Sequence, residues 1–166
     1  MMELNVGSLK IAVSLNMQFV LKSLFGFLEG SGLEYRISGG LAGNLHGSEW
    51  PLHDIDLDVP ARHIPQLRNY LIPYVFRELD WYEDEEFGIM LLQARILGVD
   101  IDVSRVEGAR LRNGERWILH EPDFSRRCRR ELLGIAVWVT SLEDLIAYKE
   151  IIGRKTDLAE LTRLGP

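Results

Sequence analysis

The sequence predicts an α+β domain in which helices flank a mixed β-sheet. Two observations carry this prediction. Short apolar runs alternate with helix-like segments through the first half of the chain, and several further strand-like runs fill the middle. Apolar residues then recur at helical spacing near the C-terminus, which indicates that the chain ends in a pair of helices.

Size and composition restrict the class of protein. The chain has 166 residues, of which 46% are hydrophobic and 27% are charged, as expected for one soluble domain spanning 1–166. The formal net charge of −6 argues against nucleic-acid binding driven by overall charge alone. The single cysteine, Cys128, excludes an internal disulfide and a cysteine-based zinc site, and it is compatible with a reducing cytoplasm.

The first half of the chain is expected to contain three helices and two strands. The segment 9–29 has an amphipathic pattern that is too polar for a signal peptide or a membrane span, and glycines follow it as helix stops. Proline follows the second strand and the last helix. The expected elements are a helix at 9–29, a strand at 33–38, a short helix at 41–46, a strand at 54–59 and a helix at 62–71.

The second half is expected to contain mostly strands, followed by the helical pair. Ser141 and Asp144 form a capping box that starts the first tail helix, and Gly153 ends it. Thr156 is the expected cap of a last helix that runs through Leu164. The expected strands are 75–81, 89–96, 99–103, 117–120 and 135–139, so the core covers 33–139 and the tail covers 141–164.

Two strand-like segments carry carboxylates at every second position. In DIDLDV, Asp54, Asp56 and Asp58 share one strand face, and the apolar residues share the other. The segment VDIDV repeats the pattern with Asp100 and Asp102. Carboxylates on neighbouring strands repel each other unless cations offset their charge, so the cluster predicts bound Mg²⁺ or Mn²⁺. Two such ions held by shared carboxylates suit phosphoryl or nucleotidyl transfer.

A glycine pair precedes the first of these strands. Gly39 and Gly40 follow an apolar strand and precede the short helix, so the backbone can approach a ligand closely and present N–H groups to an anion. The segment lacks the Gly-Lys-Ser/Thr ending of a P-loop and the spacing of a dinucleotide-binding glycine motif. It is expected to hold the phosphates of a nucleotide whose metal ions bind the aspartates.

The order of these motifs resembles the nucleotidyltransferase superfamily with a DNA polymerase β-type core. An apolar strand, GG, a short helix ending in LHG, DIDLDV and GVDIDVS follow one another, with Asp54 fourteen residues after Gly40. The tail SLEDLIAYKEIIGRKTDLAEL is similar to the small bacterial branch that includes abortive-infection-type toxin nucleotidyltransferases. The resemblance covers residues 33–163 and implies a nucleotidyltransferase-type mixed β-sheet flanked by helices, with a C-terminal helical pair.

The resemblance implies a role for each matching carboxylate. Asp54 and Asp56 would hold the metal ions. Asp102 would be the third carboxylate, which bridges a metal ion and helps to deprotonate the acceptor hydroxyl, and Asp100 is the alternative to it. Asp58 is expected to lie at the surface or behind the metal ligands.

Four residues are expected to bind the nucleotide. By resemblance, Gly39 and Gly40 would hold the triphosphate, although the commonest pattern in the superfamily has serine at the second position. Lys149 would neutralise triphosphate charge, with an exposed surface lysine as the alternative. His53, directly before the first aspartate, would contact a phosphate or stack near the nucleotide, with a polar residue at the strand start as the alternative.

The remaining conspicuous residues are expected to be structural. The basic run RRCRR, residues 126–130, is expected on a solvated face, with RNA binding as the alternative. Trp117 and Trp138 are expected in the core. Arg154 and Asp157 are expected to pair and to join the two tail helices.

Together these expectations describe an Mg²⁺- or Mn²⁺-dependent enzyme that transfers an NMP from an NTP to an acceptor hydroxyl and releases pyrophosphate. The acceptor is left open between a small molecule, an RNA and a protein. A homodimer or a small partner protein would complete the cleft of so short a chain. The alternative is a weakly active or inactive regulatory module, with the same fold, of a toxin–antitoxin or phage-defence pair.

Overall fold

The computed structural model describes residues 2–6 and 9–165, and it confirms the α+β fold. The helices are α1 (Leu15–Ser31), α2 (Gly39–Leu45), α3 (Ile64–Leu71), α4 (Leu142–Ile152) and α5 (Lys155–Arg163). The strands are β1 (Met2–Val6), β2 (Leu9–Val13), β3 (Arg36–Ser38), β4 (Asp54–Val59), β5 (Val75–Glu83), β6 (Phe87–Ile96), β7 (Val99–Arg105), β8 (Arg110–Asn113), β9 (Arg116–Leu119), β10 (Cys128–Leu132) and β11 (Ile135–Val139).

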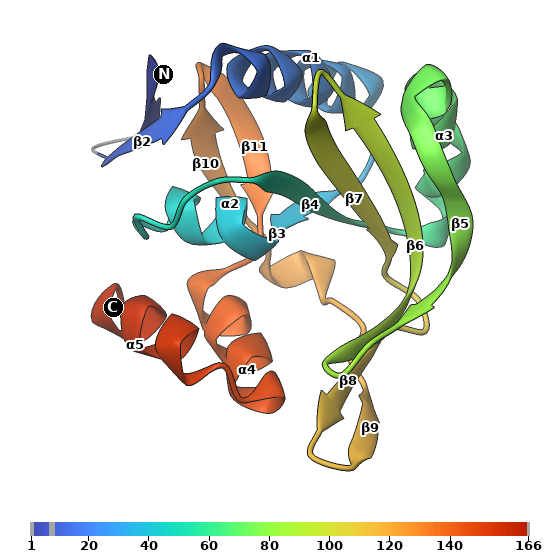
Figure 1. The fold of residues 1–166 in the computed structure, drawn as a ribbon, viewed down its shortest axis with the longest axis vertical. Helices are drawn as coiled ribbons and strands as arrows, with labels where there is room; N and C mark the ends of the chain where they lie inside the picture. Colours follow the sequence, from blue (N-terminus) through green and yellow to red (C-terminus); the bar gives the residue numbers. More distant parts are fainter. Residues whose placement is uncertain (1, 7–8, 166) are drawn as a thin grey trace.

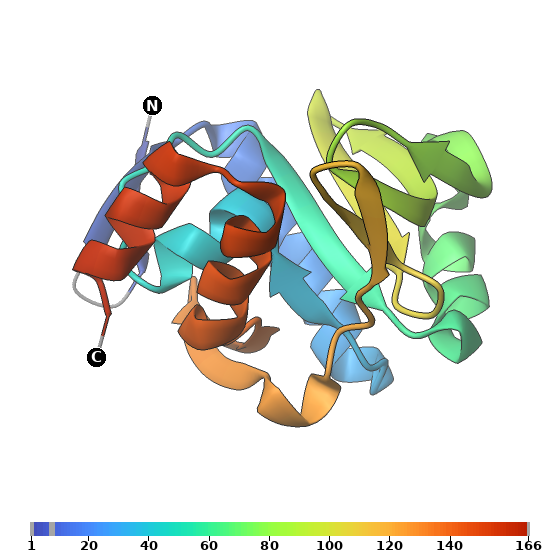
Figure 2. The ribbon, with the colours of Figure 1, turned by 90° about the horizontal axis from the view of Figure 1, so that it is seen from below.

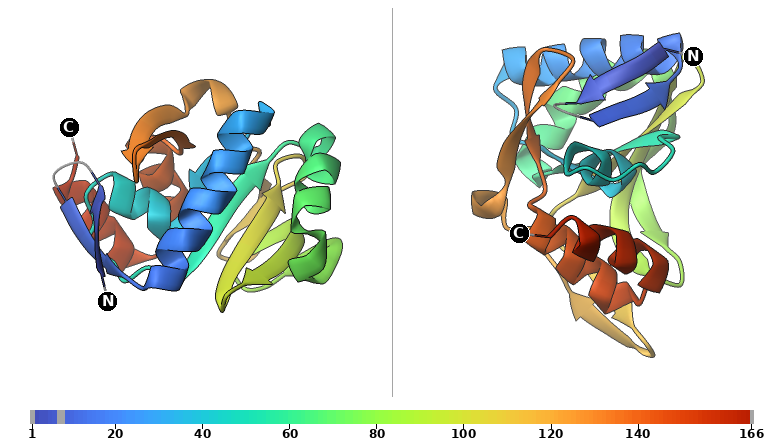
Figure 3. Two further views of the ribbon diagram at one scale, coloured as in Figure 1. Left: turned by 90° about the horizontal axis from the view of Figure 1, so that it is seen from above. Right: turned by 90° about the vertical axis from the view of Figure 1, so that its left-hand side faces the viewer.

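A nine-stranded mixed sheet forms the centre of the described structure. Its order is β10-β11-β3-β4-β7-β6-β8-β9, and β5 pairs with β6. Helix α1 crosses one face of the sheet, whereas α4 and α5 lie on the other side (Figure 1, Figure 2). Strands β1 and β2 form a separate pair beside the start of α1 (Figure 3). None of the described helices is long and apolar enough to cross a membrane.

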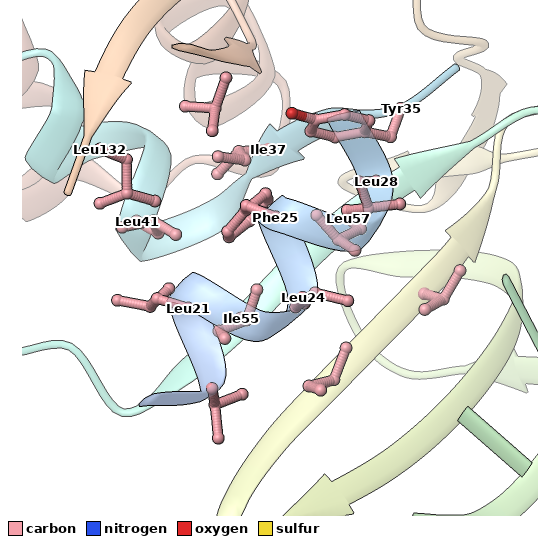
Figure 4. Close-up of a cluster of buried hydrophobic side chains, with 14 of the residues drawn as sticks. Leu21, Leu24, Phe25, Leu28, Tyr35, Ile37, Leu41, Ile55, Leu57 and Leu132 are labelled. Carbon is pink, nitrogen blue, oxygen red and sulfur yellow. The ribbon is translucent and has the colours of Figure 1, made fainter. Parts of the chain in front are cut away.

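The apolar core lies between α1 and the sheet. Leu24 and Phe25 of α1 are fully buried in one cluster with Ile55 and Leu57 of β4, as Figure 4 shows. Because side chains alternate along a strand, the apolar residues of β4 enter this core and its aspartates project from the opposite face. The core thus fixes the side of the sheet on which the carboxylates gather.

Loss of a core side chain should destabilise this packing. We expect Leu57→Ala to lower the free energy of unfolding by about 2–5 kcal/mol, because the fully buried side chain leaves a cavity behind. Urea unfolding followed by circular dichroism measures the change. Leu119→Ala is the control, since Leu119 is 65% exposed and its loss should cost less than about 0.5 kcal/mol. Equal losses in the two variants would contradict this assignment of the core.

The helix predicted at 9–29 is wrong in its first part. Residues 9–13 form strand β2, in which Ile11 and Val13 are both buried. Helix α1 begins only after Ser14, whose side-chain oxygen caps the first turn. Apolar residues occupy every second position in 9–13, which is a strand pattern. The prediction missed this pattern because it treated 9–29 as one long amphipathic helix.

Several other boundaries differ from the sequence prediction. Helix α2 begins at the glycine pair rather than at residue 41, and a 3₁₀ turn at Ala61–His63 precedes α3. Strands β8 and β10 were not predicted, and β10 includes most of the basic run 126–130. Trp117 and Trp138 are half-buried: Trp138 packs against the core, whereas Trp117 lies outside it, and arginine side chains stack on both rings.

The helical tail is confirmed except for its second cap. The Ser141 side chain accepts a hydrogen bond from the backbone N–H of Asp144 at 3.2 Å, so the predicted N-terminal cap of α4 is present. Gly153 ends α4 in the left-handed conformation, with φ of 74°. The cap predicted at Thr156 is wrong, since Arg154 occupies the cap position of α5 and Thr156 lies in its first turn.

Candidate active site

Three carboxylates meet on the face of the sheet opposite α1. Strands β4 and β7 run parallel, with Asp56 directly opposite Asp102. One carboxylate oxygen from each of Asp54, Asp56 and Asp102 lies within 4.8 Å of the other two. These side chains converge because residues two apart on neighbouring strands point to the same face. The structure therefore brings together the three residues that were predicted as metal ligands.

The other two aspartates of these strands have different partners. Asp58 accepts a hydrogen bond from Arg36 Nε at 2.7 Å, and Arg36 is itself buried. Asp100 forms an ion pair with Arg95 of β6. Of the two alternatives for the third carboxylate, Asp102 lies in the cluster and Asp100 does not.

Each carboxylate of the cluster makes ionisation of its neighbours less favourable. Burial, followed by the charges of Asp54 and Asp102, raises the pKa of Asp56 from its usual range to about 7. Burial also raises the pKa of Asp102, although the hydrogen bond that Gln93 Nε2 donates to its Oδ1 at 2.9 Å opposes that shift. Three converging carboxylate oxygens with excess negative charge fit Mg²⁺ or Mn²⁺, which are hard cations that prefer oxygen ligands.

The raised pKa of Asp56 predicts how the metal-free protein responds to pH. The folded state binds a proton at Asp56 up to a higher pH than the unfolded state does, so the free energy of unfolding falls as the pH rises from about 4 to about 7. Between about pH 5 and pH 8, wild type should therefore lose about 3 kcal/mol relative to Asp56→Asn. Urea unfolding in EDTA measures this difference. An identical pH profile for the two proteins would contradict it.

The glycine pair lies directly against this cluster. Gly39 begins α2 with φ of 60°, and a Cβ atom built on it would lie 2.0 Å from Asp56 Oδ2. Only glycine allows so close an approach in this conformation. At Gly40, by contrast, no heavy atom of the described residues beyond its chain neighbours and its own helix backbone lies within 4 Å of such a Cβ. Gly39 therefore packs directly against Asp56, whereas its approach to a bound phosphate stays a prediction.

These groups line a cavity of about 400 Å³, which Lys149 of α4 also lines. The Lys149 side chain is only 8% exposed, and its Nζ lies 2.9 Å from Asp157 Oδ2. Lys149 and Asp56 line the same cavity, and the positive charge of Lys149 opposes the rise in the pKa of Asp56. His53 is exposed and does not line the cavity. The structure thus brings Lys149, but not His53, to the predicted site.

Other residues of the cavity were not identified from the sequence. Gln93 faces Asp102 across the β6–β7 pair, and its place on the cavity face follows from strand alternation once that register is known. His120 and Tyr148 come from segments far apart in the chain, with ring centroids 6.3 Å apart. Only the tertiary fold joins them, so no spacing in the sequence could have indicated the pair.

Arg154 anchors the helical tail to the sheet. Its Nε donates a hydrogen bond to Glu86 Oε2 at 2.6 Å, in the turn between β5 and β6. The predicted ion pair between Arg154 and Asp157 is also present. It is longer than the contact with Glu86, with 3.6 Å between Arg154 Nη1 and Asp157 Oδ2. The shorter contact of Asp157 is with Lys149. The tail is therefore held across the cavity by contacts with the β5–β6 turn as well as between its own helices.

Comparison with known proteins assigns this fold and site to a family. Residues 20–164 match the profile of a family described as Aminoglycoside-2''-adenylyltransferase. The chain belongs to the aminoglycoside-2''-adenylyltransferase family. This assignment confirms the nucleotidyltransferase superfamily that the sequence motifs indicated. No curated protein matches the chain.

Solved structures share the fold of this aminoglycoside-2''-adenylyltransferase family member. The Thermotoga maritima protein TM1012, which is assigned as a nucleotidyltransferase, is 19% identical with a TM-score of 0.74, and 92% of this chain and 94% of that chain are covered. ANT(2'')-Ia in complex with adenylyl-2''-tobramycin is 20% identical with a TM-score of 0.58, and 89% and 86% are covered. The lincosamide antibiotic adenylyltransferase LnuA, bound to lincomycin, is 13% identical with a TM-score of 0.60, and 93% and 97% are covered. At these identities the likeness shows a common fold alone.

Proposed function

We propose that this protein is an Mg²⁺- or Mn²⁺-dependent nucleotidyltransferase that moves an NMP from an NTP to the hydroxyl of a small molecule and releases pyrophosphate. The convergence of Asp54, Asp56 and Asp102 within 4.8 Å carries this proposal. Membership of the adenylyltransferase family supports it. A cavity of about 400 Å³ is of the size that small-molecule sites usually have.

Each residue of the site has a distinct task in this reaction. Asp54, Asp56 and Asp102 hold the metal ions, which supply positive charge to the transferring phosphoryl group and to the leaving pyrophosphate when they are bound. The backbone at Gly39 and the charge of Lys149 bind the triphosphate. Asp102, oriented by its hydrogen bond from the neighbouring glutamine, accepts the proton of the acceptor hydroxyl. The hydroxyl oxygen bonds to the α-phosphorus as the bond between that phosphorus and the β-phosphate oxygen breaks.

The arginines of the basic run are exposed, but their guanidinium groups already have partners within the fold. Arg126 lies 3.0 Å from Asp144, and Arg129 forms an ion pair with Glu29 at 2.9 Å. Arg127 and Arg129 also stack on the ring of Trp138 in β11, at 4.2 and 4.3 Å from its centroid. These contacts occupy the guanidinium groups within the fold, which favours a small-molecule acceptor over RNA.

A nucleotide titration tests the proposal. The purified protein is titrated with each NTP by calorimetry, once with Mg²⁺ and once with EDTA, and Asp54→Ala/Asp56→Ala is titrated in parallel. We expect binding of at least one NTP that requires Mg²⁺ and is lost in the double variant. Absence of NTP binding under every metal condition would contradict the nucleotide site. Binding without transfer to any acceptor would favour the alternative of a regulatory module.

A further inference from the structure

Lys149 and Asp157 come together through the break between the two tail helices. They lie 8 residues apart in the chain, and in one continuous helix that separation would place them about 12 Å apart along its axis. Gly153 ends α4 in the left-handed conformation, so α5 turns back and lies beside α4 (Figure 1). A carboxylate of α5 thereby reaches the Lys149 ammonium group, whose side chain lines the cavity.

The ammonium group of Lys149 has hydrogen-bond donors left for a ligand. It carries three N–H donors, and Asp157 Oδ2 accepts one of them at 2.9 Å. The other close groups are the rings of Trp50 and Tyr148, whose centroids lie 6.0 and 5.5 Å from Nζ. Among the described residues only Asp157 accepts a hydrogen bond from Lys149 Nζ. Two donors are therefore available to an anion in the cavity.

The Asp157 carboxylate is itself held in place. Its Oδ2 atom also lies 3.6 Å from Arg154 Nη1. The Nε and Nη2 atoms of the same guanidinium group donate to the two carboxylate oxygens of Glu86, in the turn between β5 and β6. These contacts tie the lysine to the sheet that carries the metal ligands. Because two cations share the Asp157 oxygen, its repulsion of a nearby phosphate is also reduced.

We propose that Asp157 is a positioning residue that holds the Lys149 ammonium group in the cavity, ready to bind the triphosphate. This inference rests on the proposed function, in which Lys149 contacts the triphosphate, and it gives Asp157 a task beyond joining the tail helices. A lysine side chain loses much conformational entropy when it is fixed, so ordering it before the ligand arrives lowers the cost of binding. An ammonium group on a side chain that is only 8% exposed also needs an anionic partner, since burying an unpaired charge is costly.

NMR of the free protein with isotope-labelled lysine tests the positioning directly. In wild type the two protons on Lys149 Cε should have different chemical shifts, because a fixed side chain keeps them in different surroundings. In Asp157→Ala they should merge into one signal, since the side chain then rotates freely. The signal is assigned by its absence from Lys149→Met. A Lys149 signal that is the same in wild type and Asp157→Ala would overturn the inference.

A double-mutant cycle tests the effect on triphosphate binding. The probes are ATP, GTP, CTP and UTP, each titrated by calorimetry with Mg²⁺, and the comparison uses whichever of them binds wild type. Asp157→Ala should weaken binding by about tenfold, and Asp157→Asn, which keeps an oxygen acceptor, by about threefold. In Lys149→Met, which lacks the ammonium group, Asp157→Ala should have no further effect.

Two results of this cycle would overturn the inference. Additive losses in the two single variants would show that Asp157 supports the tail without acting through Lys149. Unchanged or tighter binding by Asp157→Ala would show that the carboxylate competes with the triphosphate for the ammonium group.

Glu160→Ala is the matched control. Glu160 lies about one turn farther along α5, its side chain is 26% exposed against 27% for Asp157, and it pairs with Arg163. It is outside the cavity lining. Its loss should leave the Lys149 signal unchanged and NTP binding within about twofold of wild type. Equal effects of Glu160→Ala and Asp157→Ala would mean that any disturbance of α5 is sufficient, and would overturn the assignment of Asp157.

The two proposals fail separately. Absence of NTP binding by wild type would overturn the proposed function. Mg²⁺-dependent NTP binding that is as tight in Asp157→Ala as in wild type would overturn only the role of Asp157.

Discussion

Replacement of Asp56 by asparagine should abolish nucleotidyl transfer, with a fall in kcat of more than about a thousandfold. Asp56 occupies the centre of the cluster: it faces Asp102 across the strand pair, and the charges of Asp54 and Asp102 both act on its pKa. Asparagine keeps the size of the side chain but removes the negative charge that a divalent ion requires. The loss should therefore appear in metal binding and in turnover together.

The fold of this variant should remain intact. In the metal-free protein Asp56 is held beside two like charges, so its neutralisation relieves repulsion rather than removing a stabilising contact. A loss of activity with unchanged or increased stability would separate a ligand role from a structural one. Transfer of labelled NMP and urea unfolding, measured on the same preparation, provide the two readouts.

Asp100→Asn is the matched control for this experiment. Asp100 lies two residues before Asp102 on β7 and pairs with Arg95 outside the carboxylate cluster. Its ion pair is partly exposed, so its loss should cost no more than about 1 kcal/mol of stability and leave transfer within a fewfold of wild type. Near-wild-type transfer by Asp56→Asn, or an equal loss in Asp100→Asn, would contradict the proposed ligand set.

Sequence-based prediction succeeded for features that depend on the residues of a single helix or strand. The alternation in DIDLDV predicted which side chains of β4 enter the core and which project into the cavity, because the period of a strand is fixed by backbone geometry. Ser141 and Gly153 likewise predicted the ends of α4, since capping depends on local hydrogen bonds and on the left-handed conformation that glycine tolerates. These features need no knowledge of distant contacts.

Prediction failed where local pattern and tertiary context differ. The basic run 126–130 was predicted on a solvated face, and Arg126, Arg129 and Arg130 are indeed exposed; what the run did not indicate is strand β10 and the partners Glu29, Asp144 and the Trp138 ring. Those partners lie on other elements, so their contribution cannot be read from the run itself. The same holds for the cavity, whose lining includes residues of β4, β6, β8 and α4.

Gly39→Ala should disrupt the site through its backbone, which makes it the second variant with a large expected effect. The added Cβ would lie 2.0 Å from Asp56 Oδ2, and alanine at φ of 60° is itself strained. The added Cβ would also lie 3.0 Å from Asp56 Cβ, so rotation of the carboxylate alone does not relieve the overlap. We expect a loss of about 2–3 kcal/mol in the free energy of unfolding and a loss of Mg²⁺-dependent NTP binding of at least about a hundredfold.

Gly40→Ala shows whether the effect belongs to the position or to the loss of any glycine. Gly40 lies in α2 with open space around its Cβ position, so alanine there should keep NTP binding within about threefold and raise stability by up to about 1 kcal/mol. The same open space explains how the superfamily pattern with serine at this position is compatible with the fold. Calorimetric titration and urea unfolding of both variants measure the contrast. If Gly39→Ala bound Mg²⁺ and NTP as wild type does, the backbone at Gly39 could not be part of the nucleotide site, and the triphosphate would have to lie on the Lys149 side of the cavity.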